Sequence, residues 1–392
     1  MNSVKVLLSV DVNCGWSLYQ MDVKNAFLHG ELQKEVYMQP LPGYNGLEGN
    51  MVCKLHIAIY GLKQSPRACG KLVVLIYVDD LIIIGDSAVE IEALKRSLHQ
   101  TFAIKDLGQL KYFLGIEMAS SKGLFLHQRK YVLDFLQEAN MLDYKPAITP
   151  MDCKLRLNID GEAMHYVSYY QRLVGKLIYL TITRPDITYA MSLASQFMHS
   201  PTVDHLHIVK RILCYLKGSI GQGIIMRNNK STTISGYTKT DWAGNTLDRK
   251  STTCYCTFVG GNLVTWKSKK QQVIAHSSAK AEYRAMTATV CELIWLKGLL
   301  SDLGFPTPSS MSLMCDNQAA MHIDANPVFR ERTKHIKVEC HFIRAQVQTQ
   351  VIRTIFTRSH DQLADLFTKA LASAPFHRFL GKLGSINLLD LA

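Results

Sequence analysis

Residues 72–85 read Leu-Val-Val-Leu-Ile-Tyr-Val-Asp-Asp-Leu-Ile-Ile-Ile-Gly, two apolar runs with a pair of acidic residues between them. Runs of Val, Leu and Ile of this length are typical of buried strands. The acidic pair, Asp79 and Asp80, is the natural place for a tight turn. The stretch therefore predicts a β-hairpin with two carboxylates at its tip.

Two adjacent carboxylates repel each other, and a divalent cation between them removes that cost. The pair is therefore either part of a metal site or an acidic turn on the surface. The hairpin by itself leaves both interpretations open, and the other motifs of the chain have to separate them.

Composition limits the class of protein. The chain has 392 residues, enough for two or three domains, and 47% of them are hydrophobic against 19% charged, which indicates a folded protein. The net charge of +12 favours nucleic acid as a partner over an anionic membrane. The ten cysteines form no Cys-x-x-Cys pair, so we expect reduced thiols rather than a zinc site.

Location follows from the same features. The N-terminus has no signal-peptide pattern, and no apolar run is long enough to span a membrane. We expect an intracellular protein of the cytoplasm or nucleus that is not secreted and has no membrane partner.

The first half of the chain after the hairpin mixes helices and strands. Ser87 and Glu90 form a capping-box pattern before a helix that ends near residue 102. We expect a strand at 110–117 with a hairpin partner at 123–127, a helix at 130–140, and a linker between about 145 and 165. Residues 168–217 have helical patterning and carry several cations: Arg172, Lys176, Arg184, Lys210, Arg211 and Lys217. These cations are either a solvated helix face or a track for a nucleic-acid backbone.

From residue 232 the pattern changes to strands at 232–241, 253–259 and 262–267, followed by a helix at 279–302 capped by Ser278. A strand at 311–315, a helix from Asn317, a helix at 334–348, a strand at 351–357 and a helix at 361–371 complete the order. This order is typical of an α/β domain with a mixed sheet.

Four carboxylates in this last region could meet at one rim of the sheet. Asp241 ends the first strand, Glu282 lies in the first turn of the long helix, Asp316 ends the fourth strand, and Asp365 lies on the last helix. Converging carboxylates on a basic protein favour a two-metal site for in-line phosphoryl displacement. For any one of them alone, a solvated side chain is the simpler interpretation.

Several motifs stand in a fixed order along the whole chain. They are Tyr-Gln-Met-Asp-Val-Lys-Asn-Ala-Phe-Leu-His-Gly-Glu-Leu at 19–32, Tyr-Gly-Leu-Lys-Gln-Ser-Pro-Arg-Ala at 60–68, Tyr-Val-Asp-Asp at 77–80, Leu-Lys-Tyr-Phe-Leu-Gly-Ile-Glu at 110–117, Leu-Val-Gly-Lys-Leu-Ile-Tyr-Leu-Thr-Ile-Thr-Arg-Pro-Asp-Ile at 173–187, Asp-Trp-Ala-Gly at 241–244, Ser-Ser-Ala-Lys-Ala-Glu-Tyr at 277–283, Cys-Asp-Asn-Gln-Ala at 315–319, Lys-His-Ile at 334–336 and Gln-Leu-Ala-Asp-Leu-Phe-Thr-Lys at 362–369. With these motifs the chain resembles the reverse transcriptase–RNase H part of a copia-type retrotransposon polyprotein.

The resemblance implies a multidomain protein of α/β and α+β class. Residues 1–145 would form a truncated reverse transcriptase palm and primer grip, 146–231 a thumb or connection region, and 232–392 an RNase H-like domain with a mixed sheet. The implied substrates are a primer/template with dNTP and an RNA–DNA hybrid, whose RNA strand is selected through its 2′-hydroxyls. Other retrotransposon proteins are possible partners.

The resemblance also implies roles for single residues. Asp22, Asp79 and Asp80 would hold the two Mg²⁺ of polymerisation, and a second pair of Mg²⁺ would lie among the RNase H carboxylates, which are Glu282, Asp316 and Asp365, with Asp241 as a further catalytic candidate. Nucleic-acid contacts are expected from Lys63, Gln64, Arg67, Arg184 and Lys334. Both reactions are phosphoryl transfers that depend on positioning and charge neutralisation.

The chain departs from the family pattern in the polymerase part. It begins after the N-terminal finger strands, and the interval before the hairpin is short. Residues 67–74, Arg-Ala-Cys-Gly-Lys-Leu-Val-Val, lead almost directly into the catalytic strand, whereas the family has a tryptophan at the place of Cys69 and several tens of residues after it. This removes one wall of the palm core, so we expect Asp22 not to reach metal-bridging distance of Asp79 and Asp80, and polymerase activity to be lost.

A further departure lies in the RNase H part, where the family usually reads Ser-Asp-Ala-Asp-Trp and residues 238–242 read Thr-Lys-Thr-Asp-Trp. The first Asp is replaced by Lys239, whose ammonium would repel Mg²⁺. Asp241 lies one pleat further along the strand and is displaced too far to replace it fully. We expect weakened or absent RNase H chemistry on an intact fold.

Three interpretations therefore remain. The chain is a retrotransposon-derived polymerase–RNase H enzyme, or a catalytically inactive remnant of the same family that binds nucleic acid, or an unrelated basic α/β protein. The ordered motifs argue against the last.

Overall fold

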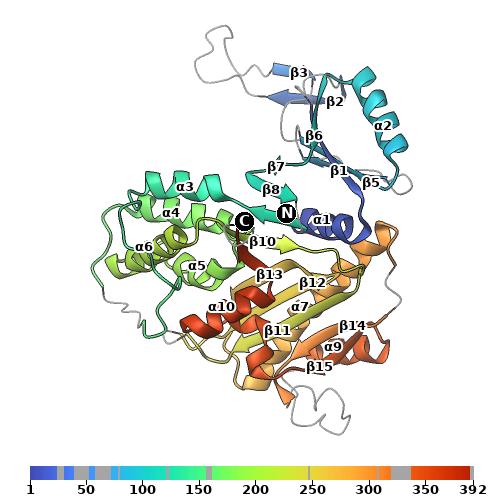
Figure 1. Cartoon of the computed structure of the whole chain (residues 1–392). Coiled ribbons are helices and arrows are strands. Elements are labelled where there is room, and N and C mark those ends of the chain that lie inside the picture. Colours follow the sequence, from blue (N-terminus) through green and yellow to red (C-terminus); the bar gives the residue numbers. More distant parts are fainter. Residues whose placement is uncertain are drawn as a thin grey trace. The chain divides into compact units, whose positions relative to one another are not determined.

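The computed structural model describes residues 1–23, 31–38, 53–57, 72–77, 80–120, 123–155, 161–245, 248–306, 309–318 and 337–388. The chain divides into two compact units, shown in Figure 1. The small unit is Gly15–Lys111, and the large unit combines Met1–Cys14 with Tyr112–Ala392.

The small unit contains an antiparallel four-stranded sheet in the order β4-β5-β1-β6. Its strands are β1 (Ser17–Val23), β4 (Leu72–Tyr77), β5 (Asp80–Gly85) and β6 (Ile104–Gln109). Strands β2 (Glu31–Met38) and β3 (Cys53–Ile57) pair separately. The predicted hairpin is confirmed, because β4 and β5 pair with Tyr77 opposite Asp80. Asp79 lies outside the described residues.

One face of this sheet is apolar and packs against helix α2 (Ala88–Thr101). Met21, Leu81 and Ile83 form its buried core together with Ile91 of the helix. The predicted cap is confirmed, because the Ser87 side chain accepts a hydrogen bond from the backbone N–H at position 90. Side chains alternate along a strand, so the residues between these apolar positions point to the other face.

The large unit has one antiparallel sheet in the order β16-β10-β9-β8-β7. Its strands are β7 (Tyr112–Phe113), β8 (Ile116–Ser120), β9 (Leu124–His127), β10 (Gln222–Met226) and β16 (Ser385–Asn387). The single strand predicted over 110–117 is wrong. The chain turns between β7 and β8 at Leu114 and Gly115, whose φ values are 48° and 75°. Glycine adopts this left-handed backbone without steric cost.

Helices α3 (Arg129–Glu138), α4 (Val167–Leu180), α5 (Thr188–Ser195) and α6 (Val203–Gly218) confirm the helical prediction for this region. Their apolar side chains, such as Leu177 and Ile212, share one buried core with Cys254 and Phe258 of the following sheet. The units therefore divide the chain differently from the predicted boundaries at 145 and 231. Among the described helices, none combines the length and the apolar character that crossing a bilayer requires.

The second sheet of the large unit has the order β13-β12-β11-β14-β15. Its strands are β11 (Ile234–Asp241), β12 (Thr252–Val259), β13 (Asn262–Lys270), β14 (Met311–Cys315) and β15 (Ile352–Phe356). The mixed sheet predicted from the sequence is confirmed, because β14 runs parallel to both of its neighbours while β11, β12 and β13 are antiparallel.

Helices cover both faces of this sheet (Figure 1). Helix α7 (Ser278–Asp302) packs on the face that carries Gly236, with α9 (Lys337–Gln348) beside it. The N-cap of α7 is Ser277, one residue before the predicted cap. On the other face lies η5 (Leu363–Phe367), a 3-10 helix where an α-helix was predicted over 361–371, and α10 (Ser373–Lys382) follows it.

A buried ion pair fixes the connection between α4 and α6. Arg184 and Asp186 flank the start of η1 (Pro185–Ile187), and their closest atoms, Nη2 and Oδ2, are 2.7 Å apart. Arg184 also donates to the carbonyl oxygen and the hydroxyl of Ser219, and the Tyr215 hydroxyl donates to Asp186. Arg184 is 1% exposed. Each charge is thus paired and hydrogen-bonded, which burial demands.

We expect Arg184→Ala to lower the free energy of unfolding by about 3–5 kcal/mol, because it leaves the buried Asp186 carboxylate without its counter-ion. Arg172→Ala is the matched control, since Arg172 pairs with Glu138 on the surface and such pairs contribute about 1 kcal/mol or less. Urea unfolding measures both variants. Equal, small losses would show that the buried pair does not stabilise this connection.

Candidate functional site

The first group of acidic residues lies on the face of the small sheet that points away from α2. Asp22 on β1 stands directly opposite Asp80 on β5. Residues opposite each other on antiparallel strands share a face, with Cβ atoms about 4.5–5.5 Å apart. The expectation that the short interval before the hairpin keeps Asp22 away from Asp80 is therefore wrong. Gln20 supports the pair by donating from Nε2 to Asp80 Oδ1 at 3.2 Å.

Other candidates fall outside the described residues. They are Asp79, which would complete the group, and the predicted nucleic-acid contacts Lys63, Gln64, Arg67 and Lys334. The structure contradicts the prediction for Arg184. Its guanidinium is buried and its donors are taken by Asp186 and Ser219, so it has a structural role and cannot reach a phosphate.

The second group, here called the carboxylate cluster, consists of Glu282, Asp316 and Asp365 around Lys239. Glu282 lies in the first turn of α7, Asp316 follows the last residue of β14, and Asp365 lies in η5. Lys239 projects from β11, the strand beside β14. The sequence prediction that these three carboxylates converge agrees with their mutual charge effects, since Lys239, Asp316 and Asp365 all shift the pKa of Glu282.

Lys239 is bonded into this cluster. Its Nζ donates to Asp316 Oδ2 at 2.6 Å. Burial alone would lower the pKa of Lys239, but the hydrogen bond and charge of Asp316, with the charges of Glu282 and Asp365, outweigh burial and raise the pKa. The ammonium therefore stays charged.

The carboxylates are buried and only partly satisfied. Glu282 is 3% exposed, and its Oε1 accepts from the backbone N–H of Thr240 at 3.3 Å. Burial is the main cause that raises the pKa of Glu282 to about 8. Asp365 is paired with Lys369, four residues later and beyond the end of η5, at 2.9 Å. One oxygen of each carboxylate, namely Glu282 Oε2, Asp316 Oδ1 and Asp365 Oδ1, has no hydrogen-bond partner among the described residues.

Charge within the cluster is balanced by the protein itself. Lys239 offsets Asp316, Lys369 offsets Asp365, and burial raises the pKa of Glu282 to about 8, which favours its neutral form. The described residues contain no group of three or more His, Cys, Asp or Glu side chains that could hold a metal ion. Mg²⁺ requires several oxygen ligands around an open centre, and here an ammonium is bonded to one of those carboxylates. The residues as they stand do not fit Mg²⁺.

Asp241 does not join the cluster. Its Oδ1 accepts from the backbone N–H of Thr252, and burial raises its pKa to about 6. Gly244 packs so closely against this carboxylate that a Cβ at that position would collide with it. Asp241 therefore anchors the loop that follows β11, and the catalytic role predicted for it has no support in this geometry.

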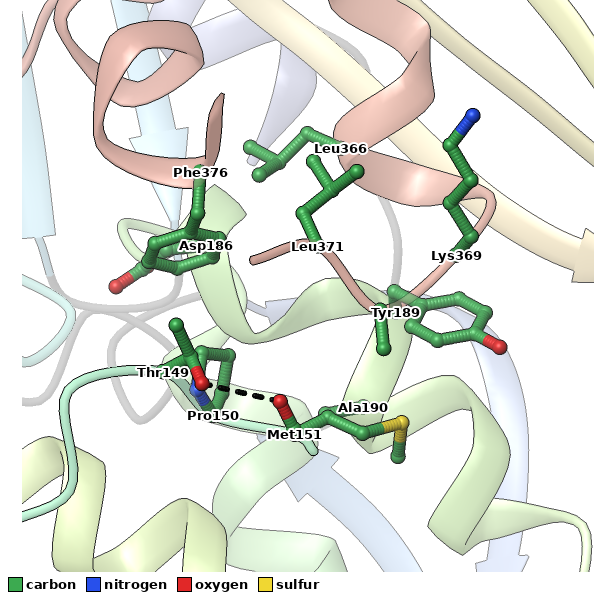
Figure 2. Close-up of a pocket in the computed structure, with 11 residues that line it drawn as sticks. Thr149, Pro150, Met151, Asp186, Tyr189, Ala190, Leu366, Lys369, Leu371 and Phe376 are labelled. Atoms are coloured by element: carbon green, nitrogen blue, oxygen red, sulfur yellow. Dashed lines mark hydrogen bonds between the residues drawn. The ribbon is translucent and has the colours of Figure 1, made fainter. Parts of the chain in front are cut away.

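A pocket beside η5 is lined by none of the three carboxylates of the cluster, although Lys369, the partner of Asp365, forms part of its wall (Figure 2). It lies between residues 149–151, the start of α5 at Tyr189 and Ala190, and the stretch from Leu366 to Phe376. The Asp186 carboxylate at its wall is already bonded to Arg184 and Tyr215. The pocket therefore lies where residues 149–151 and α5 pack against η5 and the segment after it, and this packing supports Asp365.

Sequence reasoning missed two residues of these sites. Gln20 orients Asp80, and its signal was the alternation Gln20–Asp22 on one face of β1. Lys369 neutralises Asp365, and its signal was the spacing of four residues, which brings two side chains together on a helical turn.

Comparison with known proteins gives the family. The family described as reverse transcriptase (RNA-dependent DNA polymerase) matches residues 1–70 and 67–153. The Retrovirus-related Pol polyprotein from transposon RE1 of Arabidopsis thaliana is 40% identical over 97% of this chain. An uncharacterized mitochondrial protein of the same plant is 42% identical over 56% of this chain and 92% of its own length. The chain belongs to the copia-type retrotransposon Pol family.

The similarity within this Pol family extends to the polyprotein from transposon TNT 1-94 of Nicotiana tabacum, which is 33% identical over 96% of the chain. The chain spans 28% of the RE1 polyprotein and 31% of the TNT 1-94 polyprotein. It therefore corresponds to less than a third of these relatives.

We expect Glu282→Gln to stabilise the protein increasingly as pH rises. The carboxyl has a pKa of about 8 when folded against 4.5 as its ordinary value, so the stability it contributes is complete below about pH 4.5 and is lost as pH rises to about 8. The amide of Gln loses no proton, so the variant's advantage should grow by up to roughly 1.4 kcal/mol per pH unit.

Urea unfolding between about pH 5 and about pH 8 measures this difference. Glu162→Gln is the control, because it makes the same substitution at an exposed position. A Glu282→Gln advantage that shrinks as pH rises would contradict the assignment of a buried, protonated Glu282.

Proposed function

We propose that this Pol chain binds nucleic acid on two scaffolds built for phosphoryl transfer, a reverse transcriptase palm and an RNase H-like domain, and that hydrolysis of RNA–DNA hybrids is weakened or lost. The observation that carries the proposal is the 2.6 Å hydrogen bond from Lys239 to Asp316 inside the carboxylate cluster. If hydrolysis is lost entirely, the protein is a catalytically inactive remnant that binds nucleic acid.

The RNase H-like assignment is supported by the arrangement of the cluster. A mixed sheet places Asp316 at the end of a parallel strand, a long helix supplies Glu282 from its first turn, and a short helix supplies Asp365. Two-metal hydrolysis needs such carboxylates with their charges available to cations. Lys239 removes that availability, because an ammonium and a divalent cation repel each other at this separation.

The palm assignment is supported by Asp22 and Asp80, which stand side by side on adjacent strands. Together with Asp79 they would hold Mg²⁺, which when bound neutralises charge on the phosphates of primer and dNTP. Gln20 would hold the Asp80 carboxylate in place. We propose that extension is nevertheless lost, because residues 67–74 pass almost directly into the catalytic strand and omit part of the palm.

Nucleic acid as partner is supported by the net charge of +12. Lys and Arg contacts to phosphates release counter-ions, so binding to a primer/template or a hybrid should weaken as salt increases. Affinity that is independent of salt would argue against backbone contacts.

We expect Lys239→Asp to raise Mg²⁺-dependent cleavage of a labelled RNA–DNA hybrid by at least about tenfold, because the change removes the ammonium and restores a carboxylate at that position. Mg²⁺ should also raise the melting temperature of this variant more than that of the wild type, since the variant gains a second site for the ion at the carboxylate cluster.

Lys145→Asp is the matched control, because it makes the same charge change at an exposed position between α3 and α4. The proposal fails if the wild-type protein already cleaves the hybrid at a rate that Lys239→Asp does not increase and that Glu282→Gln abolishes.

We expect no primer extension from the wild-type protein in the same buffer that supports hybrid binding. The reason is the missing part of the palm rather than the position of Asp22 and Asp80. Extension of a labelled primer with dNTP and Mg²⁺ is the assay, with Asp80→Asn as the control. Extension that disappears in Asp80→Asn would show that the shortened palm is still active.

A further inference from the structure

Exposed apolar side chains lie on the residue that follows β11 and on the loop between β13 and α7. Trp242, Val273 and Ile274 are 52%, 55% and 47% exposed. We call these three residues the aromatic platform. Large apolar side chains gathered at one place on a surface mark interaction sites more often than single exposed ones do.

The platform is held in place by hydrogen bonds. The indole Nε1 of Trp242 donates to the carbonyl oxygen of Ala275 at 2.9 Å, and Ala275 itself is buried. Arg284 Nη1 donates to the carbonyl oxygen of Val273 at 3.1 Å. The backbone of the loop between β13 and α7 is thus tied to the body of the domain, while the side chains of the platform stay exposed.

The platform lies at the end of the sheet at which β11 and β14 both finish. Trp242 directly follows the last residue of β11, the strand that carries Lys239. Asp316 directly follows the last residue of β14, which is parallel to β11. The platform and the cluster therefore leave the sheet at the same edge.

The surroundings of the platform are basic. Residues 242–284 contain seven Lys or Arg residues and two acidic ones, Asp248 and Glu282. Glu282 is buried, and Asp248 is paired with Lys270 at 2.8 Å. Arg249, Lys267 and Lys269 are exposed. The charge around the platform is complementary to a nucleic-acid backbone.

We infer that the aromatic platform binds single-stranded nucleic acid by stacking an unpaired base on Trp242, with the neighbouring cations on its phosphates. The inference rests on the proposed function and adds the strand that this edge receives. A blunt hybrid presents a free base face only at its two ends, whereas a single strand presents one at every nucleotide. Three side chains are too few for a stable protein interface, which covers about 800 Å² on each partner.

The test compares two labelled ligands on the full chain, the single strand (dT)₁₂ and a blunt RNA–DNA hybrid, by fluorescence anisotropy. Trp242→Ala should weaken (dT)₁₂ binding at least about fivefold, the low end for loss of one base stack, and should change hybrid binding less than about twofold. Trp242→Phe keeps a ring and should retain most of the affinity. Trp295→Ala, at a 39% exposed position on α7, is the matched control and should have no effect.

Each outcome decides the inference. Unchanged (dT)₁₂ binding by Trp242→Ala, with hybrid binding intact, overturns the platform and leaves the proposed function standing. If the wild-type protein binds neither (dT)₁₂ nor the hybrid, both the platform and the proposed function are overturned. If Trp242→Ala weakens binding to vesicles of phosphatidylcholine and phosphatidylserine but does not change (dT)₁₂ binding, the platform is a membrane contact and the inference is overturned. If Trp242→Ala does not fold, Ile274→Ser keeps the Trp242–Ala275 hydrogen bond and should still weaken (dT)₁₂ binding.

Discussion

The buried carboxylates at the rim of the C-terminal sheet depend on the hydrogen-bonded ion pair between Lys239 and Asp316. Three buried carboxylates at one rim repel each other, and their burial is tolerated only if positive charge or protons offset them. Lys239 supplies that charge from the neighbouring strand, and Lys369 supplies more at Asp365. The remaining carboxylate, Glu282, holds a proton because burial raises its pKa. The charges of Asp316 and Asp365 are therefore offset by the chain's own lysines, and one of these lysines is bonded to a carboxylate that a metal would need.

The small unit shows a different constraint. Pairing of β1 with β5 is set by their apolar face, where Met21, Leu81 and Ile83 are buried against α2. A slip of one residue would turn this apolar set to the other face and the aspartates toward α2. The pairing therefore holds Asp22 opposite Asp80 whatever length of chain joins the two strands. This explains why a shortened interval changes the surroundings of the acidic pair and not the pair itself.

Patterns of apolar residues predicted the elements that bury a regular face, including the hairpin at 72–85, the mixed sheet and α7. They did not predict features set by contacts from distant segments. Strand β10 is held between β9 and β16, and α1 (Asn2–Cys14) packs on β13 and is buried along most of its length. The roles of Asp241 and Arg184 were mistaken for the same reason. Their residue types suit catalysis and phosphate binding, and only the partners Thr252 and Asp186 show that both are structural.

The most direct measurement is a crystal structure of the wild-type protein grown in Mn²⁺, with the ion located by its anomalous scattering. Mn²⁺ accepts the same oxygen ligands as Mg²⁺ and can be identified unambiguously. We expect no Mn²⁺ peak among Glu282, Asp316 and Asp365, and we expect density for the Lys239 side chain to reach Asp316. A Mn²⁺ ion coordinated by these carboxylates, with Lys239 turned away, would contradict it.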